Sequence, residues 1–520
     1  MELILAVDLG TSGAKVGLVM AGGDVVAAEF EPVPLRLLPG GGAEQEPADW
    51  WAATVAAARR LLDRRSEHRP AVRAIGVTAQ WAGTVAVDAN GEPLGPAIIW
   101  MDARGAPHAR GLAGGRLRVA GYEPRKLARW IRRTGGAPSL SGRDPLGHIL
   151  WLRAERPEIY GRAARFAEPV DWLGFKLSGH LATTGVTATL HWVTDARDAR
   201  RIRYDPDLLA MAGLRHDQLP ELLDANAVLG PLTDAARREL GLDHAVPVVA
   251  GTPDTMSAAV GSGAVADHAA HLYVGTSSWL SCHVPYKRTD PLRSVASLPS
   301  AVPGRWLVSC EQETAGASLE RLRDVLLPGS GAGGLAELER LAAAAPAGSG
   351  GVVFTPWLNG ERTPVDDHVV RGGLHNLALG TTREEVARAV LEGVALNARW
   401  MQQAVERFCR RPLDPISFIG GGARSALWAQ IMADVLRRTV YRIADPGHAN
   451  LRGAAFLALL GLGELRAEDL HGRAPLAEIR RPQPQHRALY DELFAAFRGT
   501  YRPSRRLSRR LAAIREEMTA

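Results

Sequence analysis

The stretch Leu3-Ile4-Leu5-Ala6-Val7-Asp8-Leu9-Gly10-Thr11-Ser12 leads an apolar run into a Gly-Thr-Ser turn. Two more apolar runs, 16–20 and 25–30, follow across glycine-containing turns, which predicts an antiparallel meander. An amphipathic helix from Pro47 and a strand over 72–78 come next. The order meander, helix, strand is typical of an α+β or a mixed α/β protein.

A similar stretch, Leu272-Tyr273-Val274-Gly275-Thr276-Ser277, recurs in the second half of the chain. A match at this distance is typical of a duplicated two-domain protein and not of a short-period repeat array. We therefore expect an N-terminal domain over 1–245 and a C-terminal domain over 246–481. The stretch 482–520 is rich in proline and arginine, and we expect a peripheral tail there.

Composition excludes several classes of protein. The chain has 520 residues, of which 46% are hydrophobic and 23% charged, as in globular proteins of two or three domains. No apolar run approaches a membrane span and no secretion signal is evident, so we expect no membrane partner. The net charge of +6 comes without aromatic residues among the basic clusters, so no nucleic-acid partner is expected. Three scattered cysteines favour a reducing cytoplasm.

Three turns rich in small residues are candidate phosphate cradles, because only small side chains let backbone amides approach phosphate oxygens closely. Each turn alone could be an ordinary connection between two elements, but three together predict a nucleotide, ATP, held between two domains. Asp8, at the first turn, can hold Mg²⁺ through water. The candidate ATP-binding residues are Gly10, Thr11, Ser12, Lys15, Gly275, Thr276, Ser277, Gly421, Gly422 and Ala423.

Asp254 is the candidate general base. It follows an apolar strand and Gly251-Thr252-Pro253, and it stands at the start of a predicted helix over 255–260. A carboxylate at this corner can cap the helix, or it can accept a proton from an attacking hydroxyl and contact Mg²⁺. The two roles are compatible, so both stay open at this point.

The chain resembles the FGGY carbohydrate kinases, and within them most closely the xylulokinases, over about residues 3–465. Gly-Glu-Arg-Thr-Pro and Gly-Gly-Gly-Ala-Arg-Ser are the most specific motifs, and they occur in the family's order. The segments that carry the resemblance are 8–15, Glu46 to Trp51, Ile99 to Arg104, Gly251 to Asp254, Gly360 to Pro364 with Arg371-Gly372, Arg388 to Ala395, and Gly420 to Leu436.

The resemblance implies an actin/hexokinase-like (ASKHA) fold, in which two ribonuclease-H-like domains enclose a catalytic cleft. It implies ATP bound mainly by the second domain, a small-molecule sugar or polyol bound mainly by the first, and Mg²⁺ between Asp8 and Asp254. The implied reaction is phosphorylation of D-xylulose to D-xylulose 5-phosphate, with Asp254 as general base. A homodimer is left open.

Two departures from the family pattern lie on the substrate side. Gln80-Trp81-Ala82-Gly83 stands where xylulokinases resemble Gln-Met-His-Gly, and Thr255 replaces an asparagine after Asp254. Another pentulose or a pentitol is therefore the alternative acceptor. Trp81 can stack on a sugar or be a core aromatic residue, and Asp102 with Arg104 can line the pocket or brace a loop. The candidate substrate residues are Gln80, Trp81, Ala82, Asp102, Arg104, Asp254 and Thr255.

Two other classes of protein remain open. An actin- or chaperone-like ATPase shares duplicated phosphate loops, and a sugar- or nucleotide-binding regulator could keep the fold without catalysis. The intact Asp8, Asp254 and Thr276, together with Gly360 to Pro364, favour an enzyme acting on a small hydroxyl acceptor.

Overall fold

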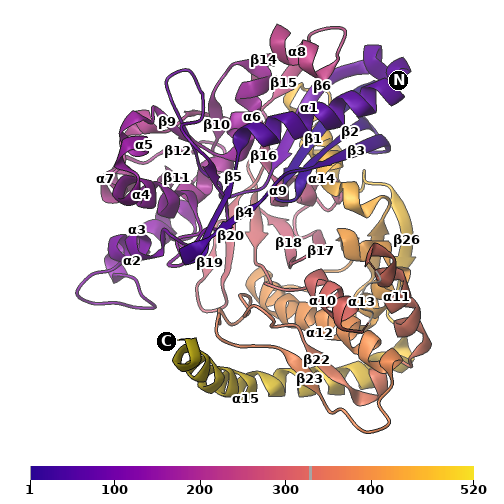
Figure 1. Cartoon of the computed structure of the whole chain (residues 1–520). Helices are drawn as coiled ribbons and strands as arrows, with labels where there is room; N and C mark the ends of the chain where they lie inside the picture. Colours follow the sequence, from indigo (N-terminus) through magenta and orange to yellow (C-terminus); the bar gives the residue numbers. More distant parts are fainter. Residues whose placement is uncertain (1, 327–330, 520) are drawn as a thin grey trace.

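The computed structural model describes residues 2–326 and 331–519, which fold into two lobes, each built on its own β-sheet (Figure 1). The first sheet has the order β14-β15-β6-β1-β2-β3, with β16 paired to the end of β6. Its strands are β1 (Leu3–Gly10), β2 (Gly13–Met20), β3 (Val25–Pro32), β6 (Val72–Ala79), β14 (Val228–Pro231), β15 (Pro247–Val249) and β16 (Thr252–Pro253).

The second sheet has the order β19-β20-β21-β18-β17-β24-β25-β26. Its strands are β17 (Ala270–Val274), β18 (Ser278–Val284), β19 (Thr289–Asp290), β20 (Val295–Pro299), β21 (Trp306–Ser309), β24 (Ile416–Ile419), β25 (Val440–Ile443) and β26 (Leu476–Arg480). The helices of this lobe are α10 (Gly316–Leu326), α11 (Gly334–Ala344), α12 (Arg383–Cys409), α13 (Ala426–Leu436) and α15 (Arg487–Thr519), beside the hairpin β22 (Val353–Thr355) and β23 (Gly373–His375).

The two sheets share one local topology around their Gly-Thr-Ser turns. β1 runs antiparallel to β2 and parallel to β6. β17 in the same way runs antiparallel to β18 and parallel to β24. The predicted meander is confirmed, and each Gly-Thr-Ser segment is the turn of an equivalent hairpin.

The first sheet is buried on both faces, which explains the unbroken apolar run of β1. Leu5 and Val7 pack in one cluster with α1 (Pro47–Arg64), while Ile4 and Ala6 pack in another with α14 (Ala449–Gly461). The helices α6 (Pro169–Ser178) and α8 (Asp234–Leu240) lie on the α1 side. Within the described residues, no helix is long and apolar enough to cross a membrane.

Smaller elements extend the first lobe, and Trp130 ties the 105–142 segment to them by packing in a buried cluster with Leu146 and Ile149. These elements are β4 (Arg36–Leu38), β5 (Gly42–Gln45), β7 (Val85–Val87), β8 (Ala97–Ile98), α2 (Ala106–Ala113), α3 (Pro124–Thr134), α4 (Pro145–Glu155), α5 (Pro157–Arg162), β9 (Arg165–Ala167), β10 (Ala182–Thr184), β11 (Thr194–Asp195), β12 (Arg203–Tyr204), α7 (Pro206–Ala212) and β13 (Glu221–Leu223).

Two helices join the lobes. α14 follows β25 of the second sheet in sequence but packs on β1, β2 and β6 of the first, where Figure 1 shows it among the strands of that sheet. It also packs against α9 (Asp254–Gly261). A Cβ atom at Gly261 would lie 1.8 Å from the Ala449 carbonyl oxygen, and one at Gly453 would lie 1.9 Å from that of Ser257, so the two backbones touch.

The structure corrects two expectations about the domains. β15 and β16 belong to the first sheet, so the first lobe continues past residue 245, and the turn into the second lobe follows α9. The tail is not peripheral in its first half, because Tyr490, Phe494 and Phe497 are buried in the core of the second lobe. The abundance of arginine hid the helical spacing of these aromatic residues.

Candidate active site

A cavity of about 260 Å³ lies where the two lobes meet at the ends of β1 and β24. The first lobe contributes Asp8 and Lys15, and the rest of the lining comes from the second sheet and from α14 with the loop before it. The lining residues are Asp8, Lys15, Tyr273, Gly420, Gly421, Arg424, Pro446, Gly447, Ala449 and Asn450. The strands that flank the first predicted phosphate turn and the glycine-rich turn after β24 thus meet at one cavity, whereas Gly10, Thr11 and Ser12 themselves do not line it.

Charged and polar groups from both lobes meet at Asp8. Lys15 Nζ lies 3.8 Å from Asp8 Oδ2 and donates a hydrogen bond to the Gly447 carbonyl oxygen at 2.9 Å. Asn450 Nδ2 donates to Asp8 Oδ1 at 3.4 Å. Burial raises the pKa of Asp8, although the charge of Lys15 opposes that rise. The cluster offers a cation for phosphate oxygens and a carboxylate for a divalent metal.

The residues of the glycine-rich turn after β24 differ in whether they face the cavity or the protein core. A Cβ atom at Gly420 would lie 2.5 Å from the Val274 carbonyl oxygen, and one at Gly422 would lie 2.7 Å from Val274 Cγ1. Gly421 has open space in that direction and lines the cavity. Ala423 is fully buried in the core. Of the three residues predicted to bind ATP in this turn, only Gly421 is placed to face a ligand.

The second Gly-Thr-Ser turn connects β17 to β18 and is held by backbone groups. The amides of Ala315 and Gly316 donate to the Thr276 and Gly275 carbonyl oxygens at 2.8 and 2.7 Å, which fixes the start of α10 on the turn. Gly275, Thr276 and Ser277 do not line the cavity. Tyr273, two residues earlier, does, and its ring stacks on Trp279 with centroids 3.9 Å apart.

Asp254 is the first residue of α9, directly after the end of β16. The helix is preceded by Pro253 and has no side-chain cap, and Asp254 Oδ1 accepts only the amide of Thr255, at 2.8 Å. Burial raises the pKa of Asp254 to about 7, and the negative charge of Asp8 acts in the same direction. Such a carboxyl group can exchange a proton near neutral pH.

Gln80 joins the substrate-side segment to the first phosphate turn. Thr11 Oγ1 donates to Gln80 Oε1 at 3.0 Å and accepts from Trp100 Nε1 at 2.9 Å. Gln80 Nε2 donates to Gln45 Oε1 at 2.8 Å. Gln80 is buried, so in this conformation its amide holds the turn in place. Gly10 and exposed Ser12 complete the turn, and the Ser12 carbonyl oxygen accepts the Val33 amide at 3.1 Å.

Trp81 and Ala82 follow Gln80 at the junction of the lobes. Trp81 stays partly exposed, packs on a cluster that includes Met256 of α9 and Leu307 of β21, and donates from Nε1 to the Thr187 carbonyl oxygen at 3.1 Å. Ala82 is buried with a φ of 61°, in the left-handed region. Trp81 is therefore mainly a packing residue here, with one edge left accessible.

Asp102 and Arg104 form a brace. Asp102 is 1% exposed and accepts the Ala43 amide at 2.9 Å and Arg104 Nε at 2.8 Å. Arg104 also pairs with Glu44 at 2.7 Å and lies over the ring of Trp151, 3.9 Å from its centroid. These contacts use the polar groups of both residues, which fits the loop-bracing alternative.

Thr255 Oγ1, beside Asp254, is buried without a hydrogen-bond partner among the described residues. A buried hydroxyl at this position is a free donor next to the candidate base. Of the substrate residues predicted from the sequence, Thr255 and Asp254 are thus the ones whose polar groups remain free for a ligand, and the side chains of Gln80, Asp102 and Arg104 are occupied.

The Gly-Glu-Arg-Thr-Pro segment lies in a charged network that was not predicted from the sequence. Arg362 pairs with Glu311 and Glu313, and Glu361 accepts Asn397 Nδ2 at 2.5 Å. Burial raises the pKa of Glu361 to about 8. The charge of Glu311 also contributes to the raised pKa of Asp254, so the network borders the base.

The family models identify both lobes. The model described as the N-terminal domain of the FGGY family of carbohydrate kinases matches residues 3–261, and that of the C-terminal domain matches residues 270–462. Xylulose kinase of Staphylococcus epidermidis is 29% identical, with 99% of each chain covered. Xylulose kinase of Escherichia coli is 30% identical, covering 96% of this chain and 98% of the relative. The crystal structure of xylulose kinase from Rhodospirillum rubrum has a TM-score of 0.83 at 26% identity, covering 98% of this chain and 100% of that one.

Proposed function

Because this chain belongs to the FGGY family of carbohydrate kinases, we propose that it transfers the γ-phosphoryl group of ATP to D-xylulose, giving D-xylulose 5-phosphate. Family membership decides against an actin- or chaperone-like ATPase and against a binding regulator, and the expected actin/hexokinase-like fold is confirmed. Xylulose is favoured because relatives named for it match nearly the whole chain. Another pentulose or a pentitol is the second candidate, because Trp81-Ala82 and Thr255 depart from the family pattern.

The observation that carries the mechanism is the position of Asp254. Its carboxylate has one free oxygen at the start of α9, and Asp8 at the cavity is close enough to raise its pKa. As general base, Asp254 takes the proton of the acceptor hydroxyl while that oxygen bonds to the γ-phosphorus and the bond to ADP breaks. Thr255 Oγ1 is placed to orient the acceptor.

The nucleotide occupies the cavity between the lobes. The Lys15 ammonium group donates hydrogen bonds to phosphate oxygens. These oxygens replace the Gly447 carbonyl oxygen, which accepts from Lys15 in this structure. Gly421 has no side chain and so leaves room for the nucleotide, and the ring of Tyr273 forms an apolar side of the cavity. Gly10, Thr11, Ser12, Gly275, Thr276 and Ser277 do not line this cavity, and their proposed role is to shape the two turns whose flanking residues Asp8, Lys15 and Tyr273 do.

Asp8 and Asp254 suit Mg²⁺, which takes one or two protein carboxylates together with substrate phosphates. Burial and, after it, the negative charge of Asp8 raise the pKa of Asp254, so a divalent cation placed between the two carboxylates would be favourable. When bound, the ion neutralises charge on the phosphates. We also infer a cytoplasmic enzyme, since Cys282, Cys310 and Cys409 are all free.

The deciding experiment is a coupled assay of ADP release with D-xylulose, D-ribulose, L-xylulose, xylitol, D-arabitol and glycerol as acceptors. D-xylulose should give the highest kcat/KM, and Asp254→Asn should abolish the difference between acceptors. A higher kcat/KM with a pentitol would replace xylulose by the second candidate. ADP release that no acceptor stimulates would overturn the assignment of the acceptor class.

A further inference from the structure

The outer half of α15 carries a basic stripe that the kinase reaction does not use. Arg498, Arg502, Arg506 and Arg510 recur every four residues, and Arg509 lies beside them; all five are exposed. Within the described part of the chain none of the five has a carboxylate partner, whereas Arg505 between them pairs with Asp367. The sequence has no acidic residue between Glu492 and Glu516. Unpaired positive charge therefore runs along one side of this helix.

An apolar stripe lies next to the basic one. Leu507, Leu511 and Ile514 are 57%, 53% and 51% exposed, and their spacing of four and three residues places them on one face. Isolated exposed leucines are ordinary, but three in register on one helix make a continuous strip. The helix therefore has three faces: one packed in the core, one apolar and one basic.

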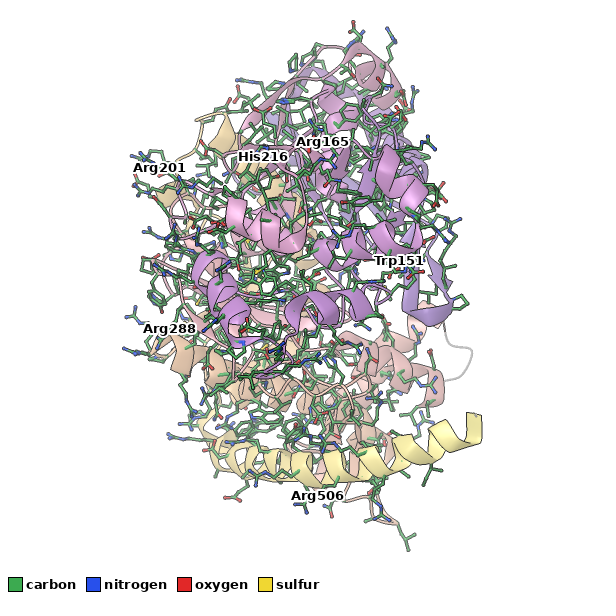
Figure 2. The ribbon with its side chains drawn as sticks, turned by 90° about the vertical axis from the view of Figure 1, so that its left-hand side faces the viewer. Trp151, Arg165, Arg201, His216, Arg288 and Arg506 are labelled. Atoms are coloured by element: carbon green, nitrogen blue, oxygen red, sulfur yellow. The ribbon has the colours of Figure 1, made fainter. Side chains whose placement is uncertain are left out.

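The first half of α15 anchors this surface. Phe494 and Phe497 are buried in the second lobe, and in the outer half Ser508 Oγ also accepts the Arg371 amide at 2.9 Å. α15 runs along the base of the molecule in both views, and Figure 2 shows Arg506 on it. The stripe is held on the outside of the enzyme, away from the cavity lined by Asp8 and Gly421.

Although the sequence predicted no membrane partner, we propose that the outer half of α15 docks the enzyme on an anionic phospholipid surface, a peripheral contact that needs no membrane-spanning helix. The unpaired arginines complement lipid phosphates, and the leucines and isoleucine enter the boundary between headgroups and acyl chains. A nucleic acid would also attract the arginines, but it offers nothing to the adjacent aliphatic strip, and the stripe has no exposed aromatic residue for stacking. A second copy of the chain would bring like charges together. The combination of the two stripes therefore favours a lipid surface, whatever the sugar substrate.

Sedimentation of the full-length enzyme with vesicles tests the proposal. Vesicles of phosphatidylcholine with about one third phosphatidylglycerol should bind the enzyme, and pure phosphatidylcholine should not. Arg506→Glu with Arg510→Glu should weaken binding by at least about 30-fold, because each arginine lost at an anionic surface costs about fivefold and each glutamate adds repulsion. Leu507→Ser with Leu511→Ser should weaken it as well. Kinase activity in solution, at a cavity that no residue of α15 lines, shows that each variant is folded.

The matched control is Arg162→Glu with Arg201→Glu, which makes the same charge change at exposed positions of the first lobe; Figure 2 shows Arg201 far from Arg506. It should bind anionic vesicles like the wild type. Equal loss in this control, unchanged binding in the leucine variant, or no binding to anionic vesicles would each overturn the proposal. The proposal would also be overturned if single-stranded DNA or RNA displaced the enzyme from the vesicles at a lower concentration than free analogues of the phosphatidylglycerol headgroup.

Discussion

The two Gly-Thr-Ser hairpins have the same topology but different surroundings. The first, between β1 and β2, is held by side chains: Thr11 bonds to Gln80 and Trp100, and Lys15 reaches Gly447 in the other lobe. The second, between β17 and β18, is held by backbone bonds from Ala315 and Gly316, and its stem presents the aromatic pair Tyr273 and Trp279.

This difference supports a proposed division of labour between the two hairpins. The first hairpin carries charge to the cavity through Asp8 and Lys15, as the reacting end of a nucleotide requires. The second contributes shape and apolar surface. The same strand-turn-strand unit can therefore serve both ends of one ligand, because its function depends on the side chains around the turn.

The largest effect is expected at Asp254, whose pKa is raised in part by Asp8 of the first hairpin. Asp254→Asn should lower kcat by about 10²–10⁴-fold, because the acceptor hydroxyl loses its general base. The KM for ATP should stay close to that of the wild type, as measured by steady-state kinetics. Activity within twofold of the wild type would leave Asp254 with a structural role only.

The pH profile tests the same group without substitution. Since the pKa of Asp254 is raised to about 7 and a base must be deprotonated, kcat/KM for the sugar should rise with pH up to about 7 and then level off. One unit of pH below that point should cost about tenfold. A profile that is flat between pH 5 and 8 contradicts the assignment of the base.

Lys15 and Ser277 compare the two hairpins directly. Lys15→Met should raise the KM for ATP by about 10- to 100-fold, because a charged hydrogen bond to phosphate is lost. Ser277→Ala, at the equivalent second turn, should change it less than about threefold. ATP titration by calorimetry measures both, and equal losses would remove the proposed division of labour.

Gly421 faces the cavity and Gly422 faces the core, so substitutions at the two positions should affect ATP binding and stability, respectively. Gly421→Val should fold normally and raise the KM for ATP about tenfold, because its Cβ direction is open and faces the cavity. Gly422→Val should instead lower the melting temperature, since its side chain would overlap Val274. Normal ATP affinity in Gly421→Val would move the nucleotide away from this turn.

The smallest effect concerns the stability of the two turns. Thr11→Val removes bonds to Gln80 and Trp100 and should lower the free energy of unfolding by about 1–3 kcal/mol. Thr276→Val, at an exposed position, should change it by less than about 0.5 kcal/mol. Urea unfolding of both variants gives the comparison, and similar values would show that side chains do not fix the first turn.

Local pattern was enough to predict the hairpins, the first helix and the place of Asp254. Short apolar runs and glycine turns are properties of adjacent residues, so the sequence displays them directly. The expected family and fold followed from motifs such as Gly-Glu-Arg-Thr-Pro, which are short and specific.

What the sequence could not give depends on distant partners or on the direction of a side chain. Asn450 contacts Asp8 across 442 residues, and no local signal announces that meeting. Gly421 and Gly422 are identical in the sequence, yet one faces the cavity and the other faces Val274. Gln80 and Asp102 were expected at the sugar, and only the fold shows that their polar groups already hold other parts of the protein.

The contact between α9 and α14 also bears on the history of the gene. A duplication begins with two copies that can each fold alone, but here α14 comes from the second copy and covers the apolar face of β1 and β6 in the first. The backbones of the two helices touch at Gly261 and Gly453, so the packing of the first lobe depends on a helix that belongs to the second. A first lobe produced without the second would therefore expose the apolar face of β1 and β6 that α14 covers.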